Sequence, residues 1–203
     1  MKKTFLITGA AGFIGFHLCK RLIKENFKIV AIDNLNPYYS IHLKKARMEE
    51  IFKQGGDISF IDGDIEDMEF LERIFKEHKP EIVFNLAAQA GVRYSISDPI
   101  PFLKTNVIGF GNILEVCRKN DIEHLIYASS SSVYGGNRNL PYLEDSRVDH
   151  PVSLYAATKK SNELMAHTYS HLYSLPATGL RFFTVYGPWG RPDMSYFLFT
   201  KAI

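Results

Sequence analysis

This sequence of 203 residues has few cysteines, almost no excess of charge and no long apolar run. Its two cysteines, Cys19 and Cys117, are too few for a disulfide framework, and no CxxC or Cys/His cluster indicates a metal site. This favours a reducing, cytoplasmic setting. The 24 Lys and Arg residues nearly balance 22 Asp and Glu residues, so a nucleic-acid partner is not expected. No run approaches the roughly 18 apolar residues of a membrane span, so a membrane partner is not expected either.

The N-terminus has one feature that resembles a secretory signal. Lys2 and Lys3 precede an apolar stretch at 4–18. Three glycines interrupt that stretch, and their pattern favours a different interpretation.

Short β-rich runs alternate with helical patterns along most of the chain. The expected strands are 5–8, 28–33, 59–62, 82–86, 124–129 and 178–182, and the expected helices are 13–26, 43–53, 68–77, 106–119 and 153–174. This alternation is typical of βαβ units with right-handed crossovers. We therefore predict an α/β fold, a doubly wound parallel sheet of the Rossmann type with strand order 3-2-1-4-5-6.

A glycine-rich turn follows the first expected strand and opens the first expected helix. Gly9 would permit the tight turn, Gly12 the close approach of a pyrophosphate, and Gly15 the packing of helix on strand. The spacing GxxGxxG is a variant of the dinucleotide fingerprint. On its own, such a pattern would also suit packing without any ligand.

Acidic residues follow the next two strands. Asp33 ends the second strand, where a carboxylate accepts hydrogen bonds from ribose hydroxyls and repels a 2′-phosphate, and this favours NAD over NADP. The alternative is an Asp that caps the following loop. Asp64 and Ile65, after the third strand, suit the adenine edge or a simple turn.

Tyr155 and Lys159 are four residues apart in an expected helix and so share one face. A phenol has an ordinary pKa near 10, and a nearby ammonium would lower the pKa of Tyr155 toward that of a useful base. The alternative is a pair of surface residues. The serine run at 129–132 lies where the fifth strand ends, the edge at which open α/β sheets bind ligands.

Together these motifs resemble the extended short-chain dehydrogenase/reductase family, and within it the NAD-dependent nucleotide-sugar epimerases. The resemblance rests on TGAAGFIG (8–15), Asp33, Asp64-Ile65, NLAAQ (85–89), SSSSVYG (129–135), YAATK (155–159) and RFFTVYGP (181–188). The stretches HPVSLYAATK (150–159) and GPWGRPDM (187–194) are similar to UDP-glucuronate 4-epimerases, which make UDP-galacturonate for surface polysaccharides.

The resemblance implies a role for each matching residue. Tyr155 would be base and acid, Lys159 would lower its pKa and hold the nicotinamide ribose, and Ser130 would hydrogen-bond the reacting oxygen. Contacts to NAD would come from Gly9, Ala11, Gly12, Phe13, Ile14, Gly15, Asp33, Asn34, Asp64, Ile65, Leu86, Ala87, Ala88, Gln89, Asn106, Tyr155, Lys159 and Phe182. Contacts to the sugar would come from Arg93, Ser130, Ser131, Ser132, Thr184 and Arg191, and Asn106 also falls where the family lines the sugar site.

Two positions bear on which reaction is expected. Sugar dehydratases of this family carry Asp-Glu where this chain has Ser131 and Ser132, which argues against dehydration. Arg191 suits a hexuronate carboxylate, because a guanidinium binds a carboxylate through two parallel hydrogen bonds. The alternative is that Arg191 pairs with Asp193 or faces solvent.

The resemblance also implies a domain plan. Residues 1–186 would form the NAD-binding domain, and residues 187–203 would begin a nucleotide-sugar region that family members continue well beyond this point. We therefore expect a truncated chain, and a homodimer at full length.

The expected function is NAD-dependent 4-epimerisation of a UDP-hexose, with UDP-glucuronate and UDP-galacturonate interconverted through a 4-keto intermediate. Another nucleotide-sugar reaction, UDP-glucose 4-epimerisation or a decarboxylation, is the alternative enzyme. A non-catalytic NAD-sensing protein is the alternative class, although a sensor does not need Ser130, Tyr155 and Lys159 together.

Overall fold

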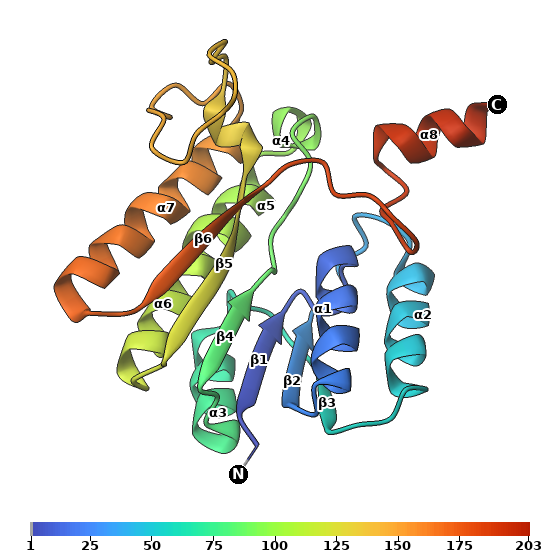
Figure 1. The fold of residues 1–203 in the computed structure, drawn as a ribbon, viewed down its shortest axis with the longest axis vertical. Helices are drawn as coiled ribbons and strands as arrows, with labels where there is room; N and C mark the ends of the chain where they lie inside the picture. Colours follow the sequence, from blue (N-terminus) through green and yellow to red (C-terminus); the bar gives the residue numbers. More distant parts are fainter. Residues whose placement is uncertain (1) are drawn as a thin grey trace.

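One parallel sheet of six strands organises the protein, whose computed structural model describes residues 2–203 (Figure 1). The strands are β1 (Thr4–Thr8), β2 (Lys28–Asp33), β3 (Ile58–Asp62), β4 (Ile82–Asn85), β5 (His124–Ser130) and β6 (Ala177–Phe182). Their order is β3-β2-β1-β4-β5-β6, and every neighbouring pair is parallel. This confirms the predicted doubly wound sheet, whose strand order reverses between β1 and β4.

Helices cover the sheet in two layers, because alternate residues of each strand point to opposite faces. The helices α1 (Phe13–Lys24) and α2 (Ile41–Phe52) lie on one face, and α3 (Met68–His78), α6 (Phe110–Lys119) and α7 (Leu154–Tyr173) lie on the other (Figure 1). Within β1, Leu6 packs with α3 and α6 in one core cluster, whereas Ile7 packs with α1 in the second. The unbroken apolar run of β1 is therefore explained by burial on both faces.

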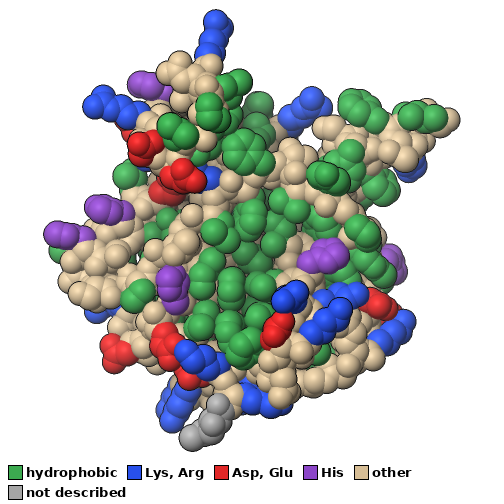
Figure 2. Space-filling view, viewed as in Figure 1, with side chains coloured by type: hydrophobic (Ala, Val, Ile, Leu, Met, Phe, Trp, Pro, Cys, Tyr) green, Lys and Arg blue, Asp and Glu red, His purple; other side chains and the backbone are tan. Residues whose placement is uncertain are grey.

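On the sheet face that carries α1 and α2, the part next to these two helices is not covered by any described helix. Apolar side chains gather there in the space-filling view, over the middle of the sheet (Figure 2). Ile82, Phe84 and Ile126 on β4 and β5 are only partly buried.

Among the described helices, none has the length and apolar composition needed to cross a membrane.

The helix predicted at 106–119 is not one uniform helix. Residues Leu103–Gly109 form a π-helical segment, η1, and α6 begins only at Phe110. Asn162 of α7 donates a hydrogen bond of 2.6 Å to the backbone oxygen of Asn106. In a regular α-helix, a backbone amide of the same helix would donate to this oxygen. Three short elements were also not predicted: α4 (Tyr94–Ser97), α5 (Ile100–Phe102) and the 3₁₀ turn η2 (Ser131–Tyr134). The helix α8 (Ser195–Ala202) follows the last strand.

The glycine-rich turn is confined by backbone packing. A Cβ on Gly15 would lie 2.2 Å from the carbonyl oxygen of Gly9, which belongs to the backbone and cannot turn aside. A Cβ on Gly136, in an exposed loop, would meet nothing within 4 Å.

Gly15→Ala should therefore lower the free energy of unfolding by about 1–3 kcal/mol, since the turn must shift to admit a methyl group. Gly136→Ala is the matched control and should change it by less than about 0.5 kcal/mol. Urea unfolding of the natural-length protein measures both. Equal effects of the two substitutions would show that Gly15 is not under packing constraint.

Candidate active site

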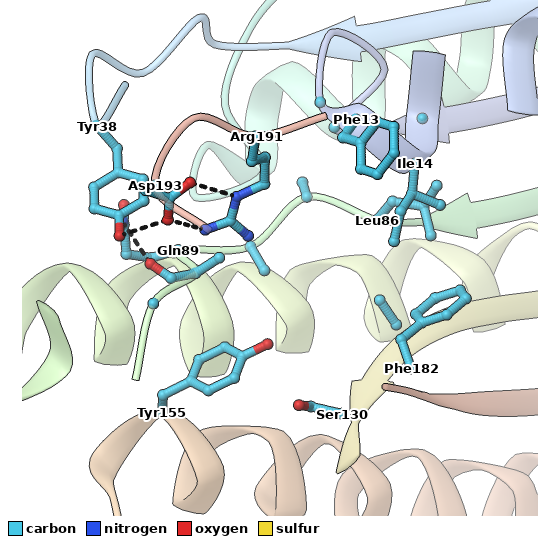
Figure 3. Close-up of a pocket in the computed structure, with 18 of the residues that line it drawn as sticks. Phe13, Ile14, Tyr38, Leu86, Gln89, Ser130, Tyr155, Phe182, Arg191 and Asp193 are labelled. Carbon is cyan, nitrogen blue, oxygen red and sulfur yellow. Dashed lines mark hydrogen bonds and ion pairs between the residues drawn. The ribbon is translucent and has the colours of Figure 1, made fainter. Parts of the chain in front are cut away.

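A cavity of about 560 Å³ opens at the carboxyl ends of the strands, a size typical of small-molecule sites (Figure 3). The glycine-rich turn and the ends of β2, β4, β5 and β6 all contribute to its wall. Apart from Ala11 and Asn106, every residue predicted to contact cofactor or sugar lines it.

The glycine-rich turn forms one wall of this cavity. Gly9 has a positive φ of +70°, and a Cβ there would lie 2.7 Å from the backbone nitrogen of Ala87. Gly12 is the N-cap of α1 and provides no side-chain cap, so the first amide groups of the helix are uncapped where they meet the cavity. Free amides at a positively polarised helix end suit a diphosphate.

Asp33 closes the end of β2 and is almost fully buried. Its carboxylate accepts hydrogen bonds from the backbone nitrogens of Ala11 (3.0 Å) and Leu35 (2.8 Å). The capping role considered as an alternative is thus present, although Asp33 also lines the cavity.

Lys44, which the sequence did not single out, lies 3.7 Å from the Asp33 carboxylate. Burial lowers the pKa of Lys44, and the negative charge of Asp33 opposes that effect. A nearby cation therefore balances the carboxylate that was predicted to face the ribose.

Asp64 and Ile65 lie beside this end of the cavity. One oxygen of the Asp64 carboxylate accepts from the Asn34 amide (2.8 Å), and the other accepts from the backbone nitrogen of Glu66 (2.9 Å). The turn role of Asp64 is therefore present, and the side chain still borders the cavity.

Tyr155 lies in the first turn of α7, which begins because Ser153 accepts a hydrogen bond from the backbone nitrogen of Ala156 (3.1 Å). Burial raises the pKa of Tyr155, whereas hydrogen bonding by Ser130 and the positive charge of Arg191 lower it. Figure 3 shows the phenol and the Ser130 hydroxyl on the same side of the cavity. Both side chains therefore line the cavity, where Ser130 was predicted to hydrogen-bond the reacting oxygen.

Lys159 lines the same cavity as Tyr155, and its ammonium is held by the end of β5. Its ammonium donates to the backbone oxygen of Ala128 at 2.9 Å, and it is not among the groups that lower the pKa of Tyr155. The side chain is 3% exposed, and burial lowers its own pKa to about 8. The cation that favours a phenolate at Tyr155 is Arg191.

Arg191 pairs with Asp193, as the alternative interpretation proposed. Its Nε and Nη2 atoms donate to the two carboxylate oxygens at 3.1 Å and 2.5 Å, and Tyr38 donates to the same carboxylate at 3.2 Å. Within residues 2–203, nothing accepts a hydrogen bond from Nη1. Figure 3 shows the guanidinium on the side of the cavity that faces Tyr155. One end of the guanidinium is thus left for a second acceptor.

Two residues predicted to contact a ligand do not line the cavity. Asn106 lies behind the cavity wall, where it accepts from the backbone nitrogen of Gln89 (2.8 Å) and donates to Thr158 (3.1 Å). Ala11 belongs to the glycine-rich turn, and its backbone oxygen accepts from Arg47 (2.9 Å). Both residues support the wall, because their polar groups are already used within the protein.

The family described as the NAD dependent epimerase/dehydratase family matches residues 5–202. This chain belongs to it. The family is NAD-dependent, and the cavity of this member suits that cofactor: the turn at Gly9 admits no side chain, the first amides of α1 are uncapped, and a buried carboxylate ends β2.

Relatives of this epimerase/dehydratase family member align with nearly all of its residues. Protein CapI of Staphylococcus aureus is 59% identical over 98% of this chain and 59% of its own length. A probable UDP-glucuronate 4-epimerase of Rhizobium meliloti is 49% identical over 98% of this chain and 58% of its own length. The crystal structure of UDP-glucuronic acid 4-epimerase from Bacillus cereus, in complex with UDP-glucuronic acid and NAD, matches with a TM-score of 0.88 at 35% identity, covering 96% of this chain and 60% of that one. The chain thus spans about three-fifths of the length of these proteins.

The buried ammonium of Lys159 makes the stability of this family member depend on pH. Because its folded pKa is about 8 and its ordinary value is 10.5, the unfolded chain holds a proton that the folded protein has lost between these values. The free energy of unfolding therefore rises with pH across this window.

Lys159→Met should remove this dependence, because methionine fills the site without a charge. The stability of the variant relative to the wild type should then fall by about 2–3 kcal/mol from pH 8 to pH 10.5. Urea unfolding of the NAD-free, natural-length protein at both ends of that window measures it, with the exposed Lys104→Met as control. A relative stability that is the same at both ends would contradict the shifted pKa.

Proposed function

We propose that the protein containing this chain interconverts UDP-glucuronate and UDP-galacturonate, with NAD as a bound cofactor. One observation carries the proposal: the guanidinium of Arg191, held on one side by Asp193, lines the same cavity as Tyr155. In a hexuronate, the carboxylate is attached next to the carbon whose hydroxyl reacts. A cation beside the general base therefore suits a substrate with a carboxylate beside its reacting hydroxyl.

Tyr155 is the proposed general base and acid. It takes the proton of the sugar 4-hydroxyl and later returns it, while Ser130 hydrogen-bonds the same oxygen. Bound NAD would supply reversible hydride transfer at C4 of the sugar. Burial opposes ionisation of Tyr155. The Ser130 hydroxyl and the Arg191 guanidinium both lower its pKa and so favour the phenolate.

Arg191 is the proposed partner of the substrate carboxylate. Asp193 occupies the Nε side of the guanidinium, so a substrate carboxylate would bind at the end through Nη1 and Nη2. In this arrangement Asp193 holds the guanidinium in place and the substrate meets the remaining donors. An uncharged hydroxymethyl group would leave those donors poorly matched.

The serines at the end of β5 support epimerisation over dehydration. Dehydration of a sugar needs an acid and a base near C5 and C6, whereas Ser131 and Ser132 provide only hydroxyl groups at the cavity wall.

We also assign residues 1–186 to cofactor binding, and the turn that carries Arg191 to sugar binding.

Tyr155→Phe should lower turnover by about 10²–10⁴-fold and leave NAD bound, since it removes the proton-transferring group but keeps the ring. Turnover of UDP-glucuronate and retention of NAD are measured in the natural-length protein. Tyr173→Phe, at the far end of the same helix and half exposed, is the control. Turnover within a few-fold of the wild type would contradict the proposed role.

Arg191→Ala should weaken binding of UDP-glucuronate by about 10–150-fold, as expected for a lost charge-assisted pair of roughly 1.5–3 kcal/mol. UDP-glucose, which has no carboxylate, should be affected much less. Competition binding of the two sugars measures the difference, with the exposed Arg138→Ala as control. An equal loss for both sugars would contradict the assignment of Arg191 to the carboxylate.

A further inference from the structure

Arg47 of α2 is fully buried, and its guanidinium has no carboxylate partner among the described residues. Its partners are backbone oxygens and one phenol. Nη1 donates to the oxygen of Ala11 (2.9 Å) and to the hydroxyl of Tyr39 (2.7 Å). Nε and Nη2 donate to the oxygen of Trp189 (3.1 and 2.6 Å), and Nη2 reaches the oxygen of Gly190 at 3.4 Å. The side chain thus joins two segments that are far apart in sequence.

The two joined segments belong to different parts of the site. Ala11 is in the glycine-rich turn, and Trp189 and Gly190 directly precede Arg191. A displacement of the Trp189 carbonyl would therefore move Arg191. Arg47 is the only side chain among residues 2–203 that hydrogen-bonds to both segments.

The turn before Arg191 is held in an unfavourable backbone conformation. Trp189 has a φ of +64°, a left-handed value that a bulky residue rarely adopts. Such a conformation persists only where the surroundings impose it. Here they include the two hydrogen bonds from Arg47, one between His17 and the oxygen of Pro188 (2.9 Å), and the contact of the indole with Phe16 at 5.5 Å between ring centroids.

Burial of a charge without an opposite charge beside it opposes folding, because the charge loses its hydration and gains no ion pair. A guanidinium, however, has five donors in one rigid plane, which can reach three or four acceptors at once. Neither lysine nor an apolar residue can bridge Ala11 and Trp189 in this way. The chemistry of the side chain therefore matches a positioning role.

We propose that Arg47 is a positioning residue: by tying the Pro188–Gly190 turn to the glycine-rich turn, it sets where Arg191 lies in the cavity. Its effect on sugar selection rests on the proposed function of Arg191. Its effect on the turn does not. Arg47 makes no contact with the reacting atoms and acts through Arg191.

A double-mutant cycle tests the effect on sugar selection in the natural-length, NAD-bound protein. Arg47→Met should raise KM for UDP-glucuronate by about 10–100-fold, as small displacements of a binding group do, with a much smaller change for binding of UDP-glucose. In the Arg191→Ala background, Arg47→Met should have little further effect. Lys45→Met removes a cation from the exposed side of the same helix and should leave both sugars unaffected.

Two outcomes of the cycle would overturn the proposal. One is a loss through Arg47→Met that is equal for both sugars although the loss through Arg191→Ala is selective for UDP-glucuronate. The other is a loss that adds fully to that of Arg191→Ala, because then Arg47 does not act through Arg191. If Arg47→Met does not fold, Arg47→Lys keeps the charge but loses the planar fork and is expected to show the same selective loss.

A second measurement separates this proposal from the function proposed above. The environment of Trp189 can be followed by fluorine NMR of protein labelled with 5-fluorotryptophan, with the signal assigned through Trp189→Phe. Arg47→Met should shift and broaden this signal, and Lys45→Met should not. An unchanged signal would overturn the positioning role. If instead Arg191→Ala weakens both sugars equally while the signal still shifts, the glucuronate assignment fails and the positioning of the turn stands.

Discussion

The close contact between the glycine-rich turn and the end of β4 is the constraint on which the cavity depends. At Gly9 the chain passes so near Ala87 that a Cβ would lie 2.7 Å from the backbone nitrogen. This approach occurs where the strand order reverses between β1 and β4, so that the connections after the two strands diverge to opposite faces of the sheet. The cavity forms in the space between them, and the uncapped amides of α1 lie along one side of it.

Burial and charge act against one another within this cavity. Burial raises the pKa of Tyr155 and lowers that of Lys159, so it favours the neutral form of each group. The charge of Arg191 opposes that tendency at the phenol. Close to Tyr39, the cations Lys44, Arg47 and Arg191 outnumber the carboxylates Asp33 and Asp193. This wall therefore carries a small positive excess, which suits ligands that bear phosphates.

Arg191 and its neighbours show how a charged side chain is both neutralised and kept available. Asp193 pairs with one side of the guanidinium, Tyr38 donates to the same carboxylate, and the oxygens of the preceding turn are held by Arg47. A guanidinium fixed on one side presents its remaining donors without the loss of rotamer freedom that a flexible side chain would suffer on binding. Preorganisation of this kind is a property of the whole loop, because no single one of these contacts would hold it.

The sequence alone determined the fold and most of the cavity wall, and the tertiary structure decided how the charged groups are paired. Strand positions were predicted to within one residue, since buried parallel strands and intervening amphipathic helices are local patterns. The glycine spacing and the i, i+4 spacing of Tyr155 and Lys159 are equally local, and they located the cofactor turn and the helix of the proposed base. The contacts that were not predicted are non-local: Lys44 beside Asp33, Arg47 on Trp189, Asn162 on Asn106, and Lys159 on Ala128. Neither spacing nor periodicity encodes these contacts, because each pairs a side chain with a partner brought near it only when the sheet and its loops have folded.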